Sequence, residues 1–242
     1  MGAERNLTLW TPPNEQLMDL RSLSRHKNRL KKSKTVFNNR LHAQQHSARP
    51  NNLVISQLRG QVKLIDKQIE ATEKAIDKVL EQKSDLSEKI NNIADSIKGL
   101  GKATVAAVIA ETNGFELMRS QGQLVSYAGY DIVQNQSGNR SGTTKISKKG
   151  NAHIRCALHF PALNVVRWNV DVFANLYNRV YDRTKIKMKG YTAVQRKLLC
   201  IIYTLWKKDK IFDPNHRNKH QLKNLDEIPM EEHKSSFCVS SY

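Results

Sequence analysis

The stretch between Gln134 and Arg155 combines hydroxyl groups and positive charge in a way that suits chemistry on a phosphodiester. It contains three serines, Ser137, Ser141 and Ser147, and no acidic residue. Its cations are Arg140, Lys145, Lys148, Lys149 and Arg155. A serine that attacks phosphorus must lose its proton, and nearby cations stabilise the charge that develops in the transition state. Spacing alone leaves all three serines open as nucleophiles, and a solvated loop with turn-forming serines is the alternative.

A second feature that suits phosphate is the short turn Gly99-Leu100-Gly101, which lies between Lys98 and Lys102. It fits the helix-hairpin-helix pattern, in which glycines allow a sharp turn and the amides of the next helix point at a DNA phosphate. Such contacts position a nucleic acid without reading its sequence. A plain helix-capping turn fits the same residues equally well.

A third basic segment extends from Arg179 to Lys210 and includes a predicted loop between two helices. Its candidate contacts to a nucleic-acid backbone are Arg183, Lys185, Lys187, Lys189 and Arg196. Contacts of this kind weaken steeply as salt is added, because each neutralised phosphate releases counterions. The alternative is a solvated, charged helix surface.

The composition points to a polyanionic partner. The 242 residues include 40 Lys and Arg but 22 Asp and Glu, a formal charge of +18, which favours nucleic acid as the partner. The net charge is +7 over residues 1–50, −1 over 51–97 and +12 over 98–242. No apolar run is long enough to span a membrane, and no signal-peptide core follows Met1. The three cysteines lack metal-site spacing, and Cys156 and Cys200 fall in apolar helical patterns that predict buried thiols. We expect a protein of a reducing, cytoplasmic compartment.

Long helices must position these features. Residues 14–45 predict one helix, and residues 46–52, with Pro50, predict a turn. Steps of four and three residues from Leu58 to Ile97 then form a heptad seam of apolar residues with two polar exceptions, Thr72 and Lys83. The two helices are predicted to pack as an antiparallel coiled-coil hairpin. A parallel dimer through the same seam is the alternative, and either arm suits oligomerisation.

The rest of the chain predicts a compact helical domain, which makes the fold class mostly α. Helices are expected over 104–111, 123–128, 152–166, 172–181 and 192–207. The domain organisation that follows is a basic helical arm over 1–50, a coiled-coil helix over 51–97, a C-terminal domain with the serine loop over 98–217, and a polar, disordered tail over 218–242.

Several motifs in order resemble one family. They are Lys98-Gly-Leu-Gly-Lys-Ala-Thr104, Ala107-Val-Ile-Ala-Glu111, Phe115, Gln123-Leu-Val-Ser-Tyr-Ala-Gly129, Gln136-Ser-Gly138, Lys145-Ile-Ser-Lys-Lys-Gly-Asn151, Ile154-Arg155, Ala157-Leu158, Arg196-Lys-Leu198 and Phe212-Asp-Pro214. Together they resemble the C-terminal domain of the IS-one-ten family of insertion-sequence transposases. Leu9-Trp10-Thr-Pro12 and Asn39-Arg-Leu41 resemble the segment before that family's coiled coil.

The resemblance implies a DNA recombinase that acts on element ends and target DNA with a guide RNA. It assigns the nucleophile, which forms a phosphoserine link to DNA, to Ser137, and leaves Ser141 and Ser147 with loop and helix-cap roles. It also implies an RNase-H-like N-terminal domain whose Asp-Glu-Asp-Asp set binds Mg²⁺. We expect no metal or other cofactor to be bound by this chain, because Glu4, Glu15 and Asp19 stand in the wrong context for that set.

The missing acidic set makes a truncated or internally started chain the expectation, incomplete as a transposase on its own. The alternative function is a non-catalytic nucleic-acid-binding remnant, or a regulator that mixes with full-length subunits through the coiled coil.

Overall fold

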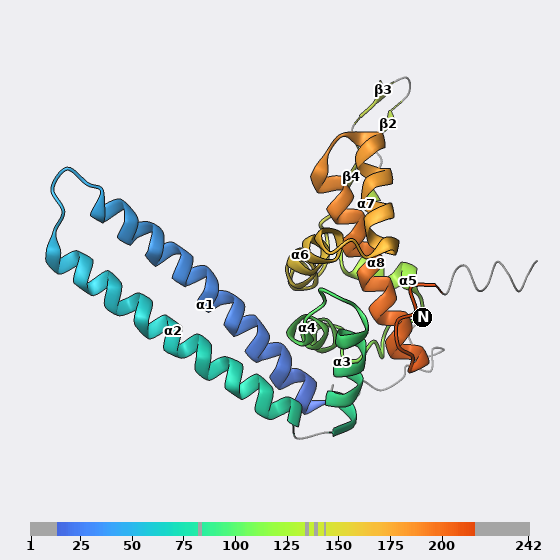
Figure 1. Ribbon diagram of the computed structural model, residues 1–242, viewed down its shortest axis with the longest axis horizontal. Helices are drawn as coiled ribbons and strands as arrows, with labels where there is room; N and C mark the ends of the chain where they lie inside the picture. Colours follow the sequence, from blue (N-terminus) through green and yellow to red (C-terminus); the bar gives the residue numbers. More distant parts are fainter. Residues whose placement is uncertain (1–13, 82–83, 134–135, 138–139, 143, 216–242) are drawn as a thin grey trace, which may run out of the picture. The chain divides into compact units, whose positions relative to one another are not determined.

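A computed structural model describes residues 14–81, 84–133, 136–137, 140–142 and 144–215 (Figure 1). The helices are α1 Glu15–Gln45, α2 Asn52–Glu81, α3 Ser84–Ser96, α4 Lys102–Glu111, α5 Gln121–Tyr127, α6 Ala152–Arg167, α7 Asp171–Thr184 and α8 Lys187–Lys208. The strands are β1 Ile132–Val133, β2 Gln136–Ser137, β3 Arg140–Ser141 and β4 Lys145–Ile146. The predicted mostly α fold is confirmed. The predicted tail over 218–242 lies outside the described residues.

Helices α1 and α2 lie side by side and antiparallel, joined by a short connection (Figure 1). Helix α1 begins where the Asn14 side chain accepts a hydrogen bond from the Gln16 amide at 3.0 Å, a cap that satisfies one free N–H of the first turn. Two lysines of α1 reach acids of α2: Lys34 lies 2.6 Å from Asp66, and Lys27 lies 3.8 Å from Glu73. The two predicted helices therefore pack within one chain, while the coiled-coil and dimer assignments stay predictions.

The heptad seam is divided between two helices. Its described members, from Leu58 to Ile97, are buried or half-buried, which is what the periodicity predicts. However, α2 ends at Glu81 and α3 begins at Ser84, so the expected single helix is two elements. The first packs on α1 and the second on α4 and α8. The spacing of apolar residues identifies the covered face but does not identify the partner that covers it.

The core is centred on α4, an apolar helix in contact with α1, α3 and α6. Val105, Val108 and Ile109 are fully buried, and α6 and α8 contribute further large side chains such as Leu158 and Leu198. Burial of this much apolar surface is the main stabilising contribution to a fold of this kind. All eight described helices fall within one compact unit that extends to Phe212.

One helix presents an apolar stripe outward. On α6, Cys156 and Phe160 are exposed at a spacing of four residues, whereas Ile154 and Leu158 are buried. The expectation of a buried Cys156 is therefore wrong, because the helix turns that position away from the core. Cys200 on α8 is half-buried, and burial raises the pKa of its thiol. Within the described residues, no helix is long and apolar enough to cross a membrane.

Candidate nucleic-acid interface

The turn between α3 and α4 leaves the start of α4 accessible. Gly99 has a φ of +96°, and a Cβ there would lie 3.2 Å from the Asn164 Cβ of α6, so the position favours glycine on two grounds. Gly101 is the exposed N-cap of α4 and provides no side chain to cap the helix. The first amides of α4 are thus uncapped, and uncapped N–H groups at a helix start attract anions.

Both lysines beside this turn are exposed and lie close to other side chains. The Lys98 ammonium lies 4.6 Å from the centroid of the Trp168 ring, within the range of a cation–π contact. The Lys102 ammonium lies 3.9 Å from a carboxylate oxygen of Asp95. These surface contacts are weak, so both cations can reorient toward a phosphate.

The serine-containing stretch forms a hairpin with two short antiparallel ladders rather than an irregular loop. At its base, Ile132 pairs with Ile146 and Val133 with Lys145. Farther along, Gln136 pairs with Ser141 and Ser137 with Arg140. The predicted loop thus contains short strands in its described part, and the β-branched residues at both ends of the polar stretch favour them. The structure describes Gln136, Ser137, Arg140 and Ser141 by their backbone.

Backbone contacts fix the base of this hairpin to the helical core. The amides of Ser147 and Lys148 donate to the carbonyls of Asp131 and Gly129 at 2.7 and 3.1 Å. Gly150 packs so closely that a Cβ would lie 2.5 Å from the Tyr127 carbonyl oxygen. The segment before α6 therefore runs against the end of α5 with no space for a side chain at Gly150.

Among the predicted cations of this region whose side chains the structure describes, Arg155 forms two hydrogen bonds through its guanidinium. It donates from Nη1 to the Ala128 carbonyl at 2.7 Å and from Nη2 to the Lys148 carbonyl at 3.2 Å. Lys145, Lys148 and Lys149 are exposed. Arg155 thus has a positioning part in holding the hairpin base, which residue type alone does not reveal.

The basic connection between α7 and α8 is anchored by aromatic packing. Arg183, Lys185, Lys187 and Arg196 are exposed, and Lys189 is half-buried. Lys185 ends α7 with a φ of +54° and lies 3.6 Å from Asp182. Nearby, the Tyr177 ring lies 4.6 Å from that of Tyr191 and 5.9 Å from that of Tyr181, centroid to centroid. The cations of this connection therefore extend from an ordered base.

Glu111, at the end of α4, is the centre of a polar cluster that sequence reasoning missed. Its carboxylate accepts from Nε and Nη2 of Arg25 at 2.7 and 2.8 Å, and from the Asn151 side-chain amide at 2.7 Å. The Arg21 Nε lies 3.3 Å from the same carboxylate. An acid at the end of an otherwise apolar helix was the available signal. The cluster joins α1, α4 and the N-cap of α6.

The pKa of the Glu111 carboxyl is lowered despite its burial. Burial alone raises it, but the hydrogen bonds from Arg25 and Asn151 and the charges of Arg25 and Arg21 outweigh that effect. Glu111 is 4% exposed, so its negative charge is held inside the protein and compensated there.

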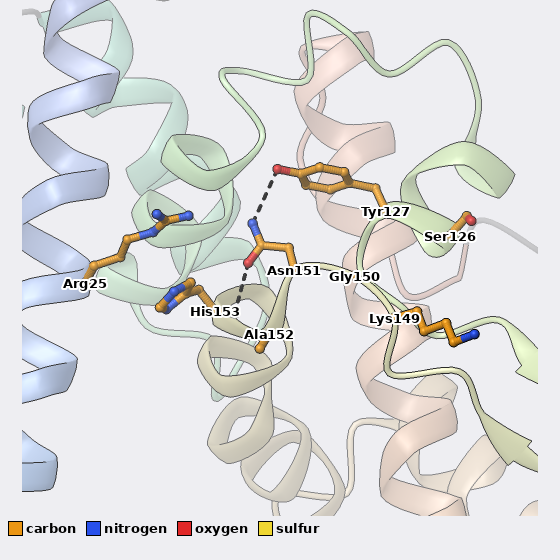
Figure 2. A pocket seen from close by; sticks show the side chains of 8 residues that line it. All are labelled: Arg25, Ser126, Tyr127, Lys149, Gly150, Asn151, Ala152 and His153. Atoms are coloured by element: carbon orange, nitrogen blue, oxygen red, sulfur yellow. Dashed lines mark hydrogen bonds between the residues drawn. The ribbon is translucent and has the colours of Figure 1, made fainter.

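An open pocket of about 550 Å³ adjoins this cluster. Figure 2 shows Arg25 of α1 approaching from one side, with His153 and Asn151 of the α6 start facing it; Lys149 points away from Arg25. Ser126 and Tyr127 line the other side. Of the predicted site residues, Lys149 lines this pocket, while the Gly99–Gly101 turn and the α7–α8 connection belong to other surfaces.

The central part of the chain is similar to transposases. Residues 91–178 match the model of the transposase IS116/IS110/IS902 family, which confirms the resemblance that the motifs predict. Pilin gene-inverting proteins of Moraxella bovis and Moraxella lacunata are each 29% identical to the chain over 119 residues. The aligned part makes up 49% of this chain and 37% of each of these relatives.

Proposed function

We propose that this chain is the nucleic-acid-binding and strand-attacking part of an insertion-sequence DNA transposase, with Ser137 as its nucleophile. The proposal rests on the pairing of Ser137 with Arg140 in a hairpin inside the family-matched segment. The base of that hairpin is fixed to the core by the contacts of Gly129, Gly150 and Arg155. Because its base is fixed, the hairpin restricts the positions of the serine. Holding the reacting groups in the correct orientation lowers the activation barrier.

In the proposed step, the Ser137 oxygen bonds to phosphorus while one ester bond of the DNA breaks. The serine proton passes to a base, and the departing deoxyribose oxygen takes up a proton. Arg140, at the register position opposite Ser137, is our candidate for stabilising the charge on the phosphoryl oxygens. The start of α4 at exposed Gly101 and the cations of the α7–α8 connection would bind the DNA backbone elsewhere along the strand.

The family resemblance implies Mg²⁺, and the described residues do not fit a site for it. No group of three or more His, Cys, Asp or Glu in this part of the chain is arranged to hold a metal ion. Glu111 is engaged by two arginines. Any Mg²⁺ of the reaction would be held by other residues, and no step here depends on it. The proposal also includes two partners. A guide RNA binds the protein, and copies of the chain assemble through α1 and α2.

The test is the formation of covalent protein–DNA adducts on element-end DNA with Mg²⁺, in a version of the protein that carries the RNase-H-like domain. We expect Ser137→Ala to abolish the adduct while leaving the dissociation constant for DNA within about twofold, since the change removes one hydroxyl. Ser141→Ala is the matched control, because it makes the same change on the neighbouring strand. Adducts that survive in Ser137→Ala, or vanish in Ser141→Ala, would remove Ser137 from the reaction. DNA binding without adducts in the unchanged protein would favour a non-catalytic regulator.

A further inference from the structure

The cations of α1 divide between two faces of the helix. Lys27 and Lys34, seven residues apart, face acids of α2. Arg25, Arg29 and Lys32 follow the same helical spacing on another face, where α1 passes the start of α6. In the described part of the chain, no acidic side chain forms an ion pair with Arg29 or Lys32. On this face Arg25 is therefore paired with Glu111, whereas the charges of Arg29 and Lys32 are not balanced by an ion pair among the described residues.

His153 responds to this charge. Partial burial lowers the pKa of its imidazole most, Glu111 opposes this by raising it, and Arg25, Lys32 and Arg29 lower it further. Arg25 lines the pocket together with His153, and Arg29 and Lys32 follow on the same face of α1. Glu111 does not neutralise them all, because Arg21 and Arg25 already surround it.

The pocket is large enough for a nucleic-acid backbone. Its volume of about 550 Å³ is within the range of ligand sites, and Ser126 and Tyr127 also line it. The His153 amide is already bonded to the Asn151 side chain at 2.9 Å, so the site is defined by side chains rather than by free amides of α6.

We propose that the pocket between α1 and the start of α6 binds a phosphodiester of the DNA backbone. Arg25 and His153, which line the pocket, are its contacts, and Arg29 and Lys32, farther along the same face of α1, extend the binding surface along the DNA backbone. The inference rests on the proposed function for its choice of ligand. It adds a contact from the helical hairpin, whereas the sequence motifs placed contacts in the C-terminal domain. Because Arg25 also holds Glu111, DNA bound here would touch the residue that joins α1 to α4.

The first test is DNA binding by the whole chain, measured by fluorescence anisotropy with a labelled random-sequence duplex at several salt concentrations. We expect Arg29→Ala/Lys32→Ala to raise the dissociation constant about fivefold or more and to make its logarithmic salt dependence shallower by about one to two. The matched control is Arg59→Ala/Lys63→Ala, which removes the same charge from exposed positions of α2. Equal effects of the two variants would overturn the proposal.

An RNA duplex of the same sequence forms a second arm, and an effect confined to RNA would overturn the assignment to DNA. Circular dichroism would confirm that both variants are folded. Binding is measured without adduct formation, so the two proposals are tested separately. The binding site can be refuted without refuting Ser137 as the nucleophile, and the reverse also holds.

The second test follows the imidazole of His153 by NMR as pH is varied, with and without the DNA duplex and with inorganic phosphate as a probe. A bound anion stabilises the protonated ring, so we expect the pKa of His153 to rise on addition of DNA. His42, exposed on α1 away from the pocket-lining residues, is the reference. Equal shifts at His153 and His42 would overturn the proposal.

Discussion

Replacing Glu111 by glutamine should weaken the junction between the helical hairpin and the core. Glutamine has the size of glutamate but replaces one carboxylate oxygen with an amide that faces the Arg25 guanidinium. Two charge-assisted hydrogen bonds, at 2.7 and 2.8 Å, can then not both form. Removing one partner of a buried ion pair costs about 3–5 kcal/mol. Because the Arg25 side chain is 30% exposed and can regain water, we expect a loss of about 2–3 kcal/mol.

The assay is urea unfolding followed by circular dichroism, with Glu73→Gln as the control. Glu73 also pairs with a cation of α1, but the contact is 3.8 Å long and the side chain is 48% exposed. Its loss should cost at most about 1 kcal/mol. A Glu111→Gln variant whose free energy of unfolding lies within about 0.5 kcal/mol of that of the control would refute the assignment of a buried, compensated carboxylate, since surface substitutions stay within that range.

The same cluster sets a pH dependence. The pKa of Glu111 is lower in the folded chain than its ordinary value of 4.5. Between the two values the unfolded chain binds the proton and the folded chain does not, so stability rises with pH there. The stabilisation from ionised Glu111 is therefore complete above about pH 4.5 and is lost as pH falls through the folded pKa. The difference in free energy of unfolding between the unchanged protein and Glu111→Gln should therefore narrow as the pH falls through that interval. A difference that stays constant with pH would contradict the lowered pKa of Glu111.

Two further predictions concern packing and exposure. Gly150→Ala should lower the free energy of unfolding by about 2 kcal/mol or more, because its Cβ would lie 2.5 Å from the Tyr127 carbonyl; Gly60→Ala in α2 meets nothing within 4 Å and should stabilise by about 0.5–1 kcal/mol. Thermal unfolding of both variants measures the two changes in stability. Similar losses of stability in the two variants would contradict the close packing of Gly150. In a Cys238→Ser background, a thiol reagent should modify exposed Cys156 before Cys200, whose pKa is raised by burial; mass spectrometry identifies the modified residue, and faster labelling of Cys200 would contradict the α6 orientation.

Helical periodicity predicted most of the fold. The helix expected over 14–45 is α1 at Glu15–Gln45, and the one expected over 152–166 is α6 at Ala152–Arg167. Apolar spacing has this power because it reports which side of a helix is covered. It could not predict that α3 leaves α2 to pack on α4, since the same stripe suits either partner.

The sequence predicted the types of the candidate site residues, but it predicted their positions in the fold only in part. The motifs located the hairpin residues Ser137 and Arg140, but pairing depends on register, which a polar stretch with few apolar positions leaves unspecified. The contact between Arg25 and Glu111 joins residues far apart in the chain. Arg155 was predicted to contact phosphate as one cation among many, and its bonds to two carbonyls follow from the fold alone.

The close approach of Gly150 to the end of α5 has a consequence for which parts of the hairpin can change. The described base of the β1–β4 hairpin is attached by main-chain hydrogen bonds, by the close approach of Gly150, by Arg155 and by the packing of Ile146 on the core. Residues beyond this base can therefore change without altering the contacts that attach the hairpin to the core. A hairpin transplanted between Tyr130 and Ser147 would be held by the same main-chain contacts, which makes this segment a unit that can be exchanged as a whole.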